Sequence, residues 1–130
     1  MIIKRLLNKQ RIRRIEGGFS FIPHRFLADG FLASLDQKEL ILYFFLVLAS
    51  DRNGVSFYAY DSICSLLQLT LDEYLKARDA LIKKDLIAFD GTFFQVLALP
   101  PKPISDNTVN GDPAVIAQVI RQSLKEASHA

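Results

Sequence analysis

The chain has 130 residues, half of them hydrophobic and 11% aromatic, with 16 Lys and Arg against 14 Asp and Glu. This length and composition suit one domain with short appendages, and they exclude a disordered chain because enough apolar side chains are present to form a core. The longest apolar run, residues 40–49, is too short to cross a bilayer, which takes about 20 residues. The single Cys64 excludes a disulfide within the chain and a cysteine-based zinc site.

The net charge of +2 is unevenly distributed along the sequence. Residues 1–25 carry seven basic residues and one acid, a net charge of +6, whereas residues 26–99 carry six basic and ten acidic residues, a net charge of −4. A basic N-terminal arm therefore precedes a slightly acidic body. Basic arms contact phosphate backbones, although a solvated terminus explains the same composition. No apolar leader follows Met1, so we expect a cytoplasmic protein.

The basic N-terminal arm, residues 1–22, has a mixed pattern. Its first nine residues have helical spacing, with four apolar side chains on one side: Ile2, Ile3, Leu6 and Leu7. Residues 11–22 fit a hairpin better, with Glu16-Gly17-Gly18 as its turn. We expect a short helix or loose arm followed by extended chain up to Pro23.

Two helices are predicted next. Pro23 suits the first turn of a helix over roughly 24–31. The second helix covers 36–49, and either Ser34 or Asp36 serves as its N-cap. Because this helix is apolar nearly all round, it lies at the centre of a domain or has its outer face covered by a partner.

A turn over 50–54 leads to a short strand at 55–58 and a third helix at about 59–67. Three of the third helix's side chains are predicted to point inward: Ile63, Leu66 and Leu67. After a turn, Thr70 and Glu73 have the spacing of a capping box that starts a helix over about 71–84.

The rest of the chain is predicted as a β-hairpin, a linker and a helix. Strands at 86–89 and 92–99 flank Asp90-Gly91, which is a strong signal for a two-residue hairpin turn. Residues 100–112 form a linker that is rich in proline at first and then polar. Residues 113–130 have the spacing of an amphipathic C-terminal helix.

The order of elements predicts an α+β fold, mainly α, that resembles a winged helix-turn-helix domain over residues 23–99. The resemblance rests on "SICSLLQLTLDEYLKARDALIKKDLIAF" followed by "DGTFFQVLAL". Cys64 takes the place of a small residue midway along the first helix of the pair, and Thr70 that of the usual Ser or Thr cap. The chain departs from the pattern at Gln68 and Asp85, where Gly is common, although Asp tolerates the left-handed conformation.

The leading helix pair, with "ELILYFFLVLASDRNGVSF", looks most like the winged-helix modules of bacterial replication and primosome proteins of the DnaD type. That resemblance implies DNA association and oligomerisation. Because this scaffold hosts many functions, the resemblance predicts the fold better than the role.

The helix over 71–84 has a charged exposed face. Two acid-first pairs at i,i+4 spacing are expected, Asp72–Lys76 and Asp79–Lys83. In helix-turn-helix proteins the start of this helix approaches the bases, where the acids of this chain would meet phosphates. This helix face therefore has two interpretations: it reads base sequence, or it is a salt-bridged or protein-contacting surface. Arg78, in the apolar arc, is expected to pair with an acid such as Asp61 or Asp51, to reach the surface, or to contact phosphate.

Ten basic residues are candidate nucleic-acid contacts: Lys4, Arg5, Lys9, Arg11, Arg13, Arg14, Arg25, Lys76, Lys83 and Lys84. No catalytic residue, metal site, cofactor or small-molecule ligand is predicted. His24 and His129 are far apart in the sequence, and Cys64 is expected to be a small core residue.

Two functional hypotheses follow. The first is a small DNA-binding protein, a replication or transcription accessory factor, with mainly backbone contacts of low specificity. The second is a protein-interaction module that dimerises or joins a larger assembly without reading DNA. A membrane partner is not expected.

Overall fold

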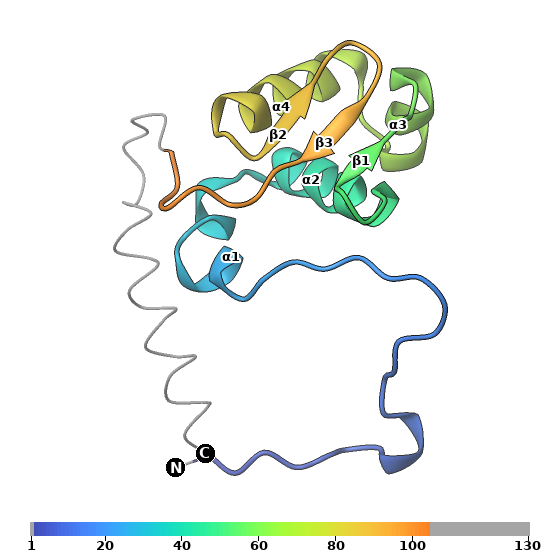
Figure 1. The fold of residues 1–130 in the computed structure, drawn as a ribbon, viewed down its shortest axis with the longest axis vertical. Helices are drawn as coiled ribbons and strands as arrows, with labels where there is room; N and C mark the ends of the chain where they lie inside the picture. Colours follow the sequence, from blue (N-terminus) through green and yellow to red (C-terminus); the bar gives the residue numbers. More distant parts are fainter. Residues whose placement is uncertain (1, 105–130) are drawn as a thin grey trace.

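The computed structural model describes residues 2–104 of the chain, with an N-terminal arm that runs away from a body of helices and one small sheet (Figure 1). The helices of the body are α1 (Arg25–Ala28), α2 (Gln37–Ala49), α3 (Tyr60–Leu67) and α4 (Leu71–Lys83). The strands are β1 (Val55–Ser56), β2 (Ile87–Phe89) and β3 (Phe94–Val96). The fold is α+β and mainly helical, as predicted from the sequence. The C-terminal helix predicted over 113–130 and most of the linker lie outside the described residues.

The arm is extended rather than helical. Residues 2–19 are exposed, and their one regular element is a 3₁₀ turn at Lys9–Arg11. The Asn8 side chain caps that turn by accepting a hydrogen bond of 3.0 Å from the Gln10 backbone N–H. A helix of nine residues without packing is marginal in water, which explains why the helical spacing of the first residues does not produce one.

The helix predicted over 24–31 is shorter than expected. It ends at Ala28, and Gly30 turns the chain with a φ of +91° before a 3₁₀ turn at Leu32–Ser34. The next helix, α2, begins where predicted because the Asp36 side chain accepts a 2.8 Å hydrogen bond from the Glu39 backbone N–H.

Helix α2 has a buried side and an exposed side. It buries Leu42 and Leu46 completely, in the core between α4 and the sheet. On the other side, three large apolar side chains are 41–58% exposed: Ile41, Phe44 and Leu48. The nearly continuous apolar sequence of α2 therefore places apolar side chains both in the core and on the exposed surface.

The turn between α3 and α4 is tight although it lacks glycine. Gln68 adopts the left-handed conformation with φ 56°, and the Leu69 N–H donates to the Cys64 carbonyl at 3.0 Å. The predicted capping box is present, because Thr70 and Glu73 exchange side-chain to backbone hydrogen bonds of 2.9 and 3.1 Å. In α3, Ile63 is buried as expected, but Leu66 points outward and is 65% exposed.

The three strands form an antiparallel sheet in the order β1-β3-β2. Phe89 pairs with Phe94, which centres the turn on Gly91-Thr92, one residue later than predicted. The Asp90 carboxylate accounts for the shift because it accepts hydrogen bonds from the backbone N–H groups of Thr92 and Phe93. The resulting register buries Phe94 fully and leaves Phe93 half exposed.

Candidate nucleic-acid interface

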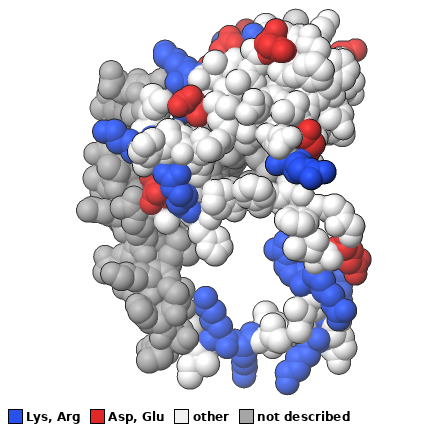
Figure 2. All heavy atoms as spheres, in the orientation of Figure 1, with Lys and Arg blue, Asp and Glu red and all other residues white. Residues whose placement is uncertain are grey.

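The cations of the arm are exposed and close together in the sequence. Among the described residues, no ion pair involves any of these six: Lys4, Arg5, Lys9, Arg11, Arg13 and Arg14. Figure 2 shows their side chains projecting from the arm, away from the mixed charges of the body. Glu16 is the single acid of this segment. The arm therefore presents unpaired positive charge to solvent.

The cations of α4 have different surroundings from one another. Lys76 pairs with Asp72 at 3.0 Å, as predicted, and both side chains are largely exposed. The second predicted pair is absent, because Asp79 binds Arg78 at 3.0 Å instead of Lys83. Lys83 is exposed and makes no ion pair within residues 2–104, so it remains available for phosphate.

Lys84 is not available for phosphate, contrary to the sequence prediction. It is buried, and its Nζ donates to Glu39 Oε1 at 2.6 Å and to the Ser34 carbonyl at 2.7 Å. These contacts join the end of α4 to the start of α2. Burial raises the pKa of Glu39, while the Lys84 ammonium acts in the opposite direction.

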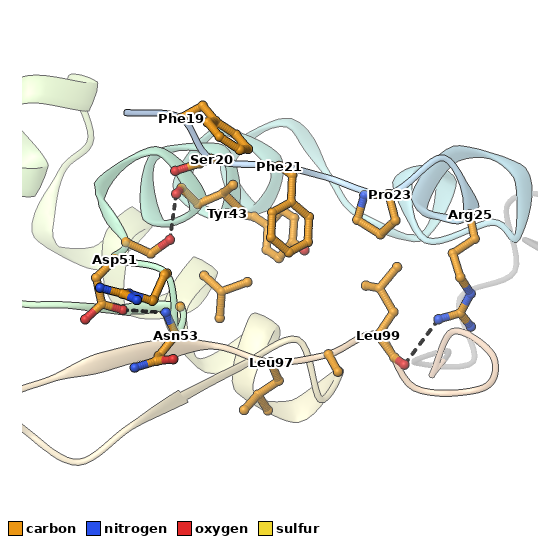
Figure 3. A pocket seen from close by; sticks show the side chains of 16 residues that line it. Phe19, Ser20, Phe21, Pro23, Arg25, Tyr43, Asp51, Asn53, Leu97 and Leu99 are labelled. Carbon is orange, nitrogen blue, oxygen red and sulfur yellow. Dashed lines mark hydrogen bonds between the residues drawn. The ribbon is translucent and has the colours of Figure 1, made fainter. Parts of the chain in front are cut away.

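Arg25 also holds the body together. Its guanidinium donates to the carbonyls of Leu99 and Pro100 at 3.2 and 2.7 Å, and it pairs with Asp29 at 3.1 Å. In Figure 3 the side chain reaches from α1 to the segment after β3. With most of its donors engaged, Arg25 is placed to position the chain rather than to contact a phosphate.

The start of α4 is occupied by an ion pair that the sequence analysis did not include. The Glu73 carboxylate binds the Lys38 ammonium of α2 and accepts the Thr70 N–H. These contacts lower the pKa of Glu73 to about 2. Glu73 is thus a fixed negative charge in the first turn of α4. Because this turn would approach the bases in a helix-turn-helix complex, the charge disfavours that mode of binding.

Arg78 does not pair with Asp61 or Asp51. Its guanidinium carbon lies 5.8 Å from the ring centre of Tyr74 and 5.2 Å from that of Phe89, and its partner is the adjacent Asp79. Arg78 therefore covers aromatic surface, a role that the helical spacing alone did not indicate.

A cavity of about 360 Å³ lies between the base of the arm, α2 and the end of β3 (Figure 3). Phe19 and Phe21 line it from the arm, Tyr43 from α2 and Leu97 from the segment after β3. The polar residues of its lining include Ser20, Arg25, Ser50 and Arg52, and the Asn53 backbone N–H donates to the Asp51 carboxylate at 2.8 Å.

A second group of residues was missed by the sequence analysis. Phe57, Tyr58 and Tyr60 follow β1 and are 43–62% exposed, beside a cavity of about 570 Å³. Three aromatic residues within four positions were the available signal, but the sequence pattern predicts only a strand at 55–58 and a helix from about 59. The nearby Cys64 thiol has a raised pKa, owing to burial and the Asp61 carboxylate, which disfavours a thiolate nucleophile.

Comparisons with protein-family models, curated proteins and solved structures give no match for this chain. Within residues 2–104, no helix is long and apolar enough to cross a membrane. The same part of the chain contains no cluster of three or more His, Cys, Asp or Glu side chains that could hold a metal ion.

Proposed function

We propose that this protein is a small winged-helix DNA-binding protein, an accessory factor in replication or transcription, which contacts phosphates and not bases. The α3–α4 pair with its capped turn, followed by β2 and β3, supports the winged-helix assignment. The resemblance to DnaD-type modules, which rests on the sequence of the leading helix pair, is part of this proposal. One observation carries the function: the arm presents six exposed cations without ion-pair partners in the described structure.

The proposed contact set is smaller than the ten residues predicted from the sequence. Lys84 and Arg25 are engaged within the body, so they are left out. The arm supplies six cations, and α4 adds two more, Lys76 and Lys83. Phosphate contacts are independent of sequence, and each releases condensed counterions, so binding is expected to be weak and strongly dependent on salt.

The test is a titration of duplex and single-stranded DNA at several salt concentrations. The six arm cations should contribute about −5 to the slope of log K against log salt for duplex DNA, since each contact contributes about −0.9. Deleting residues 2–14, or replacing the six arm cations by Gln, should remove most of the binding. The matched control replaces Lys76 and Lys83 by Gln and should change the slope by at most about 2. Unchanged duplex affinity after loss of the arm charges would refute the proposal.

A second candidate function is a protein-interaction module on the same scaffold. The exposed apolar side of α2, formed by Ile41, Phe44 and Leu48, favours it. Light scattering of the wild type and of Phe44→Ser tests this role. A wild-type monomer at high concentration would exclude self-association through α2.

A further inference from the structure

An aromatic groove lies on the body between the segment after β1, the start of α4 and the turn that joins β2 to β3. Its cavity of about 570 Å³ is lined by, among others, Phe57, Tyr58, Tyr60, Leu71, Arg78 and Phe89. The first four of these side chains are 43–62% exposed. The buried Tyr74 lines it as well. A concentrated aromatic surface of this kind is typical of a site that another segment covers.

The charge around the aromatic groove favours a cationic occupant over a nucleic acid. Five acids are each adjacent in sequence to a lining residue: Asp61, Asp72, Glu73, Asp79 and Asp90. Three of them already pair with cations of the same chain, Asp72 with Lys76, Glu73 with Lys38 and Asp79 with Arg78. Arg78 is the one cation among the lining residues, and it already pairs with Asp79 and covers Phe89. The groove therefore offers phosphates no unpaired cation. Lys or Arg side chains would meet its aromatic rings and the carboxylates of Asp61 and Asp90, which form no ion pair within residues 2–104.

The beginning of the arm has the complementary chemistry. Residues 2–7, "IIKRLL", combine two cations with four apolar side chains that are 57–96% exposed. Leu7 is 96% exposed and Ile3 is 80% exposed, so neither is used by the body. Residues 9–14 instead carry four cations: Lys9, Arg11, Arg13 and Arg14. The arm thus divides into an apolar docking segment (residues 2–7) and a basic segment (residues 9–14).

The arrangement of the chain points to a second copy as the source of the docking segment. The arm leaves the body beside α1 and runs away from the end of the body that carries the β2–β3 turn (Figure 1). Extended chain spans about 3.3 Å per residue, so residues 2–22 reach about 70 Å. A body of this size is about 30 Å across, so the arm is long enough for the groove of its own body or of a neighbour. Its course away from the groove, and not its length, favours a neighbouring molecule (Figure 1).

We propose that residues 2–7 of one copy dock into the aromatic groove of a second copy. The apolar side chains lie against Phe57, Tyr60 and Leu71, and Lys4 and Arg5 approach the surrounding aspartates. The basic segment stays outside the groove, where it is free to contact phosphates. This association does not depend on the proposed DNA binding, but it places Lys4 and Arg5 against the groove and leaves the four cations of the basic segment for phosphates.

The test combines sedimentation of the full chain over a range of concentrations with cross-linking from position 7. Ile3→Ser/Leu7→Ser and Phe57→Ala/Tyr60→Ala change only exposed residues, and each should raise the dissociation constant of self-association at least about tenfold. Phe44→Ala on α2 is the matched control and should leave it unchanged. Arg13→Gln/Arg14→Gln should weaken DNA binding without affecting self-association.

A photo-reactive residue in place of Leu7 identifies the contact in a mixture of ¹⁵N-labelled and unlabelled protein. Cross-links between labelled and unlabelled chains at residues 57–60 are expected. Cross-links confined to one chain, a monomer at all concentrations, or loss of association in Phe44→Ala alone would each overturn the proposal. So would protection of the groove aromatics by a single-stranded oligonucleotide in the Ile3→Ser/Leu7→Ser protein, because nucleic acid would then be the occupant. If DNA binding persists in both Phe57→Ala/Tyr60→Ala and Ile3→Ser/Leu7→Ser, the proposed function is retained even when the proposed self-association is refuted.

Discussion

Replacing Lys84 by Met should destabilise the protein strongly, and the structure sets the magnitude. The change removes a buried ammonium that lies 2.6 Å from Glu39 Oε1 and 2.7 Å from the Ser34 carbonyl. The side chains of Lys84 and Glu39 are only 9% and 11% exposed, so water cannot replace the lost partner. Loss of one member of a buried ion pair typically costs about 3–5 kcal/mol.

Protonation of Glu39 limits the cost of the remaining charge. A carboxyl with an ordinary pKa of 4.5 takes about 1.36 kcal/mol per pH unit to protonate, hence about 3.4 kcal/mol at pH 7 and about 0.7 kcal/mol at pH 5. The lost hydrogen bond to Ser34 adds about 1 kcal/mol at either pH. Lys84→Met should therefore cost about 4.4 kcal/mol at pH 7 and about 1.7 kcal/mol at pH 5.

Urea unfolding followed by far-ultraviolet circular dichroism at both pH values measures these costs. The matched control, Glu39→Leu/Lys84→Met, removes both charges and should lie within about 1–2 kcal/mol of the wild type. Two results would refute the reasoning: a cost below about 1 kcal/mol for Lys84→Met at pH 7, or the same cost at both pH values. Once folded, Lys84→Met should bind DNA with unchanged affinity, because the ammonium does not reach the surface.

Three further predictions concern the local structure. Thr70→Ala removes half of the capping box and should lower the free energy of unfolding by about 1 kcal/mol, measured with urea. Glu73 has a pKa lowered to about 2, so its contribution to stability is present above about pH 4.5 and is lost as the pH falls towards 2. Glu73→Gln should flatten that part of the stability–pH curve, and an unchanged curve would contradict the assignment. Gly54→Ala would place a Cβ 2.5 Å from a β3 carbonyl oxygen, whereas Gly91→Ala meets no atom within 4 Å at a similar positive φ. Gly54→Ala should therefore lower the melting temperature well beyond the effect of Gly91→Ala, which carries only the backbone strain of about 1–2 kcal/mol.

The sequence predicted the elements whose signals are local. The Asp36 and Thr70 side chains set the starts of α2 and α4, because a cap needs only its own next three residues. The left-handed Asp85 was also foreseen. The hairpin turn was misplaced by one residue because the Asp90 side chain competes for the backbone N–H groups of the turn.

The candidate site was less predictable, because charge alone does not say what a side chain contacts. Lys84 and Lys83 are neighbours in the sequence, yet one is buried against Glu39 and the other is exposed. Arg25 lies with the arm in the sequence but binds carbonyls some 75 residues away. Such contacts depend on how α1, α2 and α4 are arranged, which periodicity does not encode.

The Arg25 contacts to Leu99 and Pro100 also bring the start and the end of the body side by side. A domain whose two ends meet can be spliced into a loop of another protein, or opened elsewhere and rejoined at its natural ends. The exposed turn at Gly91-Thr92 is the place to open it, since an added side chain meets nothing there. A circular permutant opened at this turn would keep the order of the helices in the core, but the arm would no longer precede α1. Attaching the arm at the new terminus would then show whether its function depends on where it joins the body.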